Sequence, residues 1–339
     1  MIRSLILFSL IACPSVLAHD GHDHAAYPPD TRPGAEGEQS AKATAPRVEI
    51  TEVEGFRVIT SNAVPAHAMG RFPNRGNPHA MSPQEIVLRV PMVPREATKP
   101  VPNGRGFFGV ALNGVPFEPH TAEYWKNDRN SGWRMEVKSP RHSLGLDENN
   151  AHVQSSGLYH YHGPPTGLMS QRAKDAENKE GMIQLGWAAD GYPIYSARGH
   201  VQADNATSPI KPLRSSWQLK KGDRPEPPTG PGSRYDGRYE QDFEFVAGSG
   251  DLDELNGRYG VTPEFPDGTY YYVVTVEFPF LARSFKGMPD SSFQQKGGLG
   301  QSRGRGAGRG GQRGERGGRG GRGGRGGRPG GPRGPGRDR

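Results

Sequence analysis

The chain has 339 residues and a net charge of +7, a length that allows one or two folded domains. Residues 303–339 hold 12 Arg against one Glu and one Asp, so residues 1–302 carry a net charge of −3. The basic charge therefore belongs to the end of the chain. Net charge gives no support for a nucleic-acid-binding surface on the rest of the protein.

The first 18 residues have the pattern of an export signal. Arg3 supplies the positive charge, residues 5–12 are apolar, and small residues end the segment at Ala18. We therefore expect cleavage after Ala18 and a periplasmic or extracellular protein. A lipoprotein signal, with Cys13 as the lipidated residue, remains the alternative. No stretch is apolar over the length that a membrane-spanning helix needs.

Residues 19–46 are polar, rich in proline and without periodicity, and they predict a disordered linker. Cleavage after Ala18 would place three histidines at the new N-terminus, namely His19, His22 and His24. Together with the terminal amine they would form a flexible chelator for copper or zinc.

Residues 47–295 carry the patterns of one mainly-β domain, a single sandwich or barrel with long loops and a few short helices. A hairpin is expected around Glu54-Gly55, and a second one, with a type I′ turn, at Asn113-Gly114. Asp190-Gly191 joins two further strands in the same manner. Short helical turns are expected at 121–127 and 251–256. The remaining strands are predicted at residues 85–92, 239–246 and 269–280.

Three histidines fall within eleven residues of the chain. Side chains alternate between the faces of a strand, so His160 and His162 share one face, while Tyr159 and Tyr161 share the other. His152 is far enough away to return on a neighbouring strand. Neutral imidazoles are typical ligands of zinc and copper. The pattern predicts a transition-metal site, against the alternative of histidines that merely fill a polar core.

The segment that holds His160 and His162, Gly157–Pro165, resembles the motif that names the YHYH domain family. The similarity extends to the blocks at 109–117, 144–154, 189–195, 250–257 and 262–270. The resemblance implies an exported bacterial domain and no assured reaction.

Other residues complete the expected site. The fourth ligand is left open among water, His142, Asp147 and Asp190. Binding roles are also expected for the residues that flank the three histidines, namely Tyr159, Tyr161, Asn150 and Gln154.

An acidic cluster at Asp251, Asp253 and Asn256 raises the possibility of a calcium site. The EF-hand spacing is missing, and a helix capped by Asp251 with Glu254 at its third position explains the residues better. Calcium is therefore the less favoured cofactor, after zinc or copper.

Residues 296–339 form a tail rich in Arg and Gly, with RGG repeats and little to bury, so disorder is expected. Such a tail binds polyanions by releasing counterions, with anionic polymers or the cell envelope as targets. A solvated spacer is the alternative.

The sequence supports an exported metal-binding domain first. A metal-dependent hydrolase or oxidase and a structural module that binds surfaces or polyanions are the alternatives. It names no specific protein partner.

Overall fold

A computed structural model describes residues 44–139, 144–175 and 181–294. The expected signal segment, the expected linker up to residue 43 and the Arg/Gly tail lie outside these ranges, and so do His19, His22, His24 and His142. Contacts group residues 1–301 into one unit and residues 302–339 into another, and every described residue belongs to the first. The domain boundaries stay predictions.

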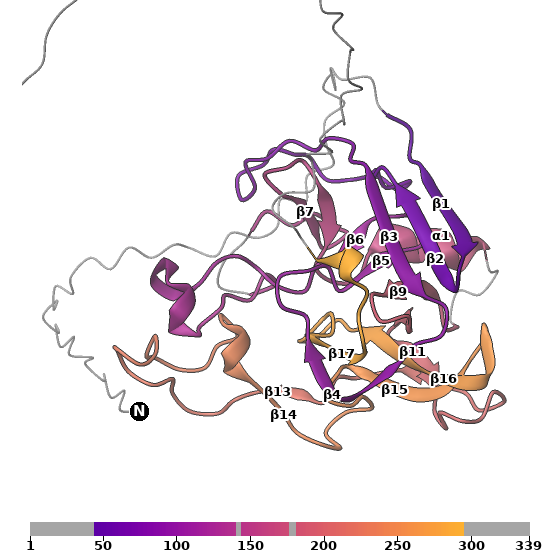
Figure 1. The fold of residues 1–339 in the computed structure, drawn as a ribbon. Helices are drawn as coiled ribbons and strands as arrows, with labels where there is room; N and C mark the ends of the chain where they lie inside the picture. The colour runs from indigo at the N-terminus through magenta and orange to yellow at the C-terminus, as the bar shows by residue number, and fades with distance from the viewer. Residues whose placement is uncertain (1–43, 140–143, 176–180, 295–339) are drawn as a thin grey trace, which may run out of the picture. The chain divides into compact units, whose positions relative to one another are not determined.

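The described chain is built mainly from strands, as expected, with one α-helix, α1 (Thr166–Asp175) (Figure 1). The strands are β1 (Val48–Val53), β2 (Phe56–Ser61), β3 (Ile86–Pro91), β4 (Glu96–Pro102), β5 (Gly109–Ala111), β6 (Pro116–Phe117), β7 (Ala151–Val153), β8 (Tyr159–Tyr161), β9 (Gln184–Ala188), β10 (Pro193–Ser196), β11 (Arg198–His200), β12 (Ile210–Pro212), β13 (Trp217–Leu219), β14 (Phe243–Phe245), β15 (Gly257–Thr262), β16 (Phe265–Val274) and β17 (Ser284–Gly287). Four 3-10 turns complete the elements: η1 (Trp125–Asn127), η2 (Arg129–Ser131), η3 (Glu240–Asp242) and η4 (Ser291–Phe293).

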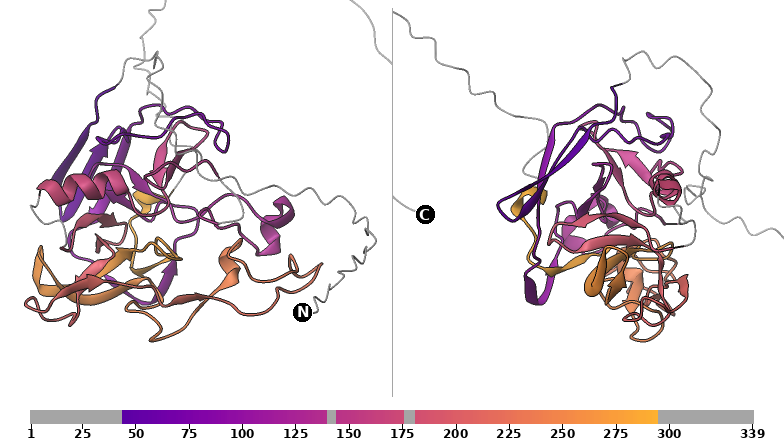
Figure 2. Two further views of the ribbon diagram at one scale, coloured as in Figure 1. Left: turned by 180° about the vertical axis from the view of Figure 1, so that it is seen from behind. Right: turned by 90° about the vertical axis from the view of Figure 1, so that its right-hand side faces the viewer.

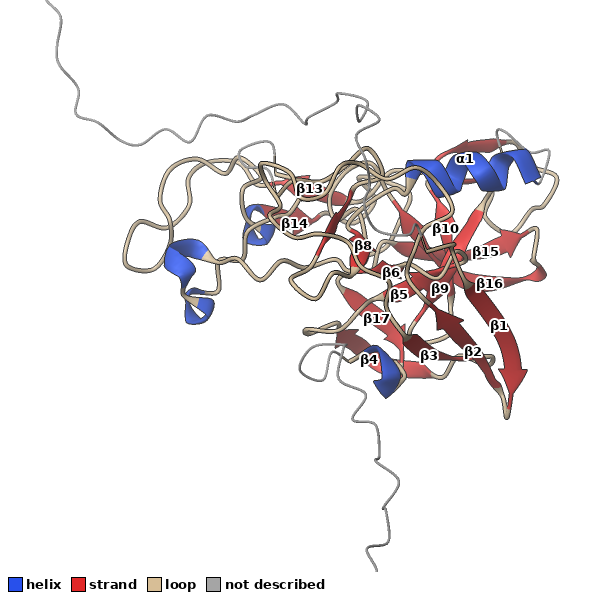
Figure 3. Cartoon of the chain, turned by 90° about the horizontal axis from the view of Figure 1, so that it is seen from above, coloured by secondary structure: helices blue, strands red, loops and turns tan. Residues whose placement is uncertain are grey.

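The central sheet has eight strands in the order β15-β16-β10-β9-β5-β6-β8-β7. It ends at β15 and β7, which do not pair with each other, so the closed barrel among the expected arrangements is not formed. A three-stranded sheet, β1-β2-β3, lies beside it, as the two views of Figure 2 show. Figure 3 shows the larger strands gathered on one side and long loops with 3-10 turns on the other.

The β1–β2 hairpin forms as predicted. Glu54 and Gly55 have φ of 50° and 79°, the two positive values that a type I′ turn requires. In β3, Ile86, Leu88 and Val90 are buried and the residues between them are exposed. This alternation places one face of the small sheet on the core.

The turn type predicted at Asn113-Gly114 is wrong. Only Gly114 has a positive φ, 79°, and the amide of Ala111 donates to the carbonyl of Val115. The connection therefore has three residues and uses glycine as a bulge after an ordinary turn. Asp190-Gly191 repeats this arrangement, with a positive φ at Gly191 alone.

The second half of the strand β16, residues 270–274, is buried on both faces, which explains its unbroken run of aromatic and β-branched residues. Tyr270 and Tyr272 belong to the main core, while Tyr271 and Val273 belong to a second, smaller cluster with Tyr195. Strand alternation sends neighbours in opposite directions, so a strand between two cores has no polar face.

The helix predictions are only partly right. A 3-10 turn forms within 121–127, but 251–256 forms no helix, because Asp253 instead accepts hydrogen bonds from the amides of Leu255 and Gly257 across a tight turn. Helix α1 was not predicted. Leu168 is its one buried side chain. Its sequence therefore shows no clear apolar stripe by which a helix could be recognised.

Candidate metal centre

Strands β7 and β8 bring the three predicted histidines together. They are antiparallel, and His152 pairs directly with His160. His162 lies two residues beyond His160 and so shares its face. The Nε2 atom of His162 lies 2.8 Å from that of His160 and 3.1 Å from that of His152. Three rings therefore converge on one point.

The geometry fits a metal ion. Ligands at about 2.0–2.1 Å in a tetrahedral site stand roughly 3.3 Å from one another. The three ligand atoms lie within 4.8 Å of one another, and they form the one cluster of possible metal ligands among the described residues. Nitrogen lone pairs at such separations repel unless a proton or a cation lies between them.

Backbone groups orient the rings. The Nδ1 atoms of His152 and His160 lie 2.8 and 3.2 Å from the carbonyl oxygens of Leu144 and Leu158. A proton on Nδ1 that is donated to a carbonyl leaves the Nε2 lone pair free for an ion. The buried Nδ1 atom of His162 has no hydrogen-bond partner within the described chain.

Burial favours the neutral form of all three imidazoles. His160 and His162 are 1% and 3% exposed, and His152 is half-buried. Burial lowers the pKa of each ring, and the neighbouring rings lower the pKa of His160 and His162 further. Metal binding requires neutral imidazole, so these rings need not lose protons at neutral pH.

Glu118 is a further candidate ligand that the sequence analysis missed. It directly follows β6, the parallel neighbour of β8, and its amide donates to the carbonyl of Tyr161. Its Oε2 lies 3.5 Å from the Nε2 atom of His160 and accepts a hydrogen bond from Gln154. No local motif marks this residue. It reaches the histidines only because β6 lies beside β8.

The two tyrosines of the motif point the other way. The hydroxyl of Tyr159 donates to Asp147 at 2.7 Å, and that of Tyr161 lies 2.8 Å from Nδ2 of Asn113 and 2.5 Å from Nε2 of His67. Both tyrosines are fully buried. Their hydroxyls are committed to the core, on the face of β8 away from the histidines, and a binding role for them stays a prediction.

Asn150 and Gln154 lie at the two ends of the β7–β8 pair. Asn150 has a φ of 53° in the turn before β7, and its side chain donates to the carbonyl of Pro164 and accepts from Lys138. These bonds hold the turn in place. Gln154 contacts the site through Glu118, so of the two it is the one that touches a candidate ligand.

The structure does not bring the proposed aspartates to the histidines. The carboxylate of Asp147 accepts from the amides of Gly70, Asn149 and Ala151 as well as from Tyr159. Neither it nor Asp190 belongs to the ligand cluster found in the described ranges.

Asp190 lies in the turn between β9 and β10, where it accepts from the hydroxyl of Tyr272 at 2.6 Å and the amide of Gly287 at 2.9 Å. Burial raises its pKa to about 6, although these hydrogen bonds oppose the rise.

The acidic cluster proposed for calcium is likewise committed to protein contacts. Asp251 pairs with Lys211 and accepts from the amide of Arg214, while Asp253 holds its turn and accepts from the hydroxyl of Tyr270.

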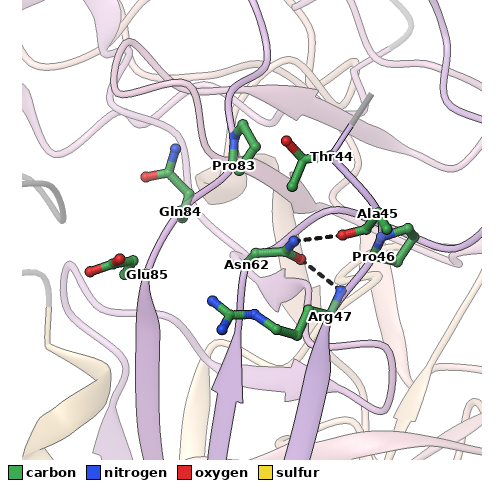
Figure 4. A pocket seen from close by; sticks show the side chains of 8 residues that line it. All are labelled: Thr44, Ala45, Pro46, Arg47, Asn62, Pro83, Gln84 and Glu85. Atoms are coloured by element: carbon green, nitrogen blue, oxygen red, sulfur yellow. Dashed lines mark hydrogen bonds between the residues drawn. The ribbon is translucent and has the colours of Figure 1, made fainter. Parts of the chain in front are cut away.

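A hollow of about 520 Å³ lies elsewhere, between the start of β1 and the segment before β3 (Figure 4). Asn62 accepts there from the amide of Arg47 and donates to the carbonyl of Ala45. Its lining holds no histidine, and its ionisable residues are limited to Arg47 and Glu85. It offers no chemistry comparable with that of the histidine cluster.

Comparison with known proteins agrees with the motif. A family profile described as YHYH protein matches residues 87–287, a span that contains both β7 and β8. No curated protein matches this chain, and no solved structure matches it. No helix in the described ranges is long and apolar enough to cross a membrane.

Proposed function

This chain belongs to the YHYH protein family, and we propose that it is an exported domain that binds one transition-metal ion, zinc or copper, through the Nε2 atoms of His152, His160 and His162. The signal-like residues 1–18 support export. The convergence of three Nε2 atoms, with two of them 2.8 Å apart, is the observation that carries the metal site.

The donor set suits such an ion. Imidazole nitrogens bind zinc and copper well, and three of them with one more ligand complete a tetrahedral site. Glu118 is the protein group best placed to be the fourth ligand, because its Oε2 lies 3.5 Å from Nε2 of His160. Its hydrogen bond from Gln154 fixes the carboxylate in the way that outer partners fix metal ligands.

The test must separate this site from the N-terminal histidines. We would replace His19, His22 and His24 by alanine in the full chain, load it with zinc or copper, remove excess ion and measure the bound metal. About one equivalent should remain, as expected for a single site.

His160→Gln together with His162→Gln should abolish this retained metal. His200→Gln is the matched control, because His200 is a half-buried strand residue whose Nδ1 also faces a carbonyl, that of Ser208. Loss of metal in the control, or retention in the double variant, would contradict the proposal.

A further inference from the structure

The outer edge of the three-stranded sheet is open at β1. This strand pairs with β2 along one side only, and Figure 1 shows it at the border of the sheet. All of its residues are exposed. An exposed edge strand presents backbone groups on which another strand can assemble, so we examined what β1 can pair with.

The backbone groups of β1 point alternately towards β2 and away from it. The amide of Asn62 donates to the carbonyl of Arg47, so these two residues form a hydrogen-bonded pair at the start of the β1–β2 ladder. Such pairs recur at every second residue of an antiparallel ladder. Val48, Ile50 and Glu52 therefore turn their N–H and C=O groups outward. Within the described chain these outward groups have no hydrogen-bond partner.

The apolar side chains of these outward residues lie on the core-facing side of the sheet but are incompletely covered. Ile50 pairs with Ile59 of β2, which pairs in turn with Leu88 of β3, and both of these partners are buried. Ile50 itself is 41% exposed, and Val48 on the same face is 39% exposed. A further strand beside β1 would place its own side chains against these two residues.

A second copy of β1 complements the first in one antiparallel register. Only with Ile50 facing Ile50 of the other copy do all three outward residues of each strand find partners, because Val48 then faces Glu52. On the other face of the sheet, Glu49 faces Thr51. No glutamate therefore opposes a glutamate directly. Registers centred on Glu49 or on Glu52 would set like charges opposite each other, which destabilises a sheet.

We propose that two copies of this chain associate edge to edge through β1, in antiparallel pairing about a two-fold axis at Ile50. The two three-stranded sheets then form one continuous sheet. A two-fold contact uses the same surface on both copies and closes on itself, so association stops at a dimer. The contact uses no residue of the histidine cluster and does not depend on a bound metal.

Disulfide trapping tests this register. Hydrogen-bonded antiparallel partners have Cα atoms about 5.5 Å apart, a separation that a disulfide spans. In the full chain with Cys13→Ser, Ile50→Cys should therefore give a covalent dimer under mild oxidation. Val53→Cys is the matched control, because Val53 is an exposed residue of the same strand. Its two copies would lie roughly 20 Å apart and should not be linked.

Sedimentation equilibrium of the full chain measures the association itself, with a chelator present so that metal cannot bridge the N-terminal histidines of two copies. Ile50→Lys replaces two facing apolar side chains by two facing positive charges, so the dissociation constant of the dimer should rise at least about 10-fold. Val87→Lys adds the same charge to an exposed valine of β3, away from the edge, and should associate like wild type.

Melting temperatures would show that each variant is folded, and the trapping experiment remains decisive if Ile50→Lys is not. Another occupant of the edge, such as a different segment of the same chain, would leave the protein monomeric. A wild-type chain that is monomeric at every protein concentration, equal trapping of Ile50→Cys and Val53→Cys, or unchanged association in a folded Ile50→Lys variant would overturn the proposal.

Discussion

The two faces of the β7–β8 pair differ in how their polar groups are satisfied. On one face the hydroxyls of Tyr159 and Tyr161 have partners within the protein, at 2.5 to 2.8 Å. On the other face the Nε2 atoms of His152, His160 and His162 meet chiefly one another. A polar group that is satisfied inside the fold contributes to stability. Imidazole nitrogens that converge without hydrogen-bond donors or acceptors to match them indicate that a ligand binds between them.

The largest expected effect is the loss of metal affinity when a histidine of this cluster is replaced. His162→Gln removes the central nitrogen, which lies nearest to both other rings. Loss of an outer partner costs 10–100-fold in metal affinity, so loss of a ligand should cost roughly 100-fold or more. Competition with a chelator of known affinity measures this change. Affinity equal to that of wild type would show that the rings do not hold the ion.

The next effect tests the tyrosine face. Tyr161→Phe leaves Asn113 and His67 without the hydroxyl they contact, so the free energy of unfolding should fall by about 1–3 kcal/mol. Denaturant unfolding measures it. Metal affinity should stay the same, because this hydroxyl lies on the other face. A large loss of metal with no change in stability would reverse the roles of the two faces.

A smaller effect is expected at Glu118. Glu118→Gln removes the charge but keeps a side-chain oxygen that can still bind the ion, so metal affinity should fall by only about 10-fold, less than for His162→Gln. Gln154→Ala provides the companion measurement, since Gln154 holds the carboxylate in place. A greater loss for Glu118→Gln than for His162→Gln would make the carboxylate, not the imidazoles, the principal ligand.

The smallest effect is on stability and concerns Asp190. Its buried carboxyl group, like the hydroxyls of the two tyrosines, has hydrogen-bond partners within the protein. Its pKa is raised to about 6, above the ordinary 3.8, so the folded state binds its proton more tightly than the unfolded state. Its contribution to stability is therefore full below about pH 4 and is lost as the pH rises through 6. Between pH 5 and 7 the loss should be about 1 kcal/mol.

Comparison of wild type with Asp190→Asn in denaturant at several pH values isolates this carboxyl group from all others. If the two proteins show the same pH dependence, the carboxyl group of Asp190 has an ordinary pKa.

Several features of the fold and the site could be predicted from local sequence. Alternation along a strand placed His160 and His162 on one face and the two tyrosines on the other, and Glu54-Gly55 marked a hairpin. These predictions succeeded because strand periodicity and turn conformation depend on a few neighbouring residues. The mainly-β class followed from the same patterns. Helix α1 was missed because it has only a weak apolar stripe for a sequence pattern to show.

The sequence by itself determined the spacing of the three histidines, the shared strand face of His160 and His162, and the position of the positive charge in residues 303–339. Only the tertiary structure decided that Glu118 would join them, since it arrives on β6, and that Asp190 would be committed to Tyr272 and Gly287. The physical reason is that strand pairing and burial bring together residues far apart in sequence, and no local pattern records which partners they meet.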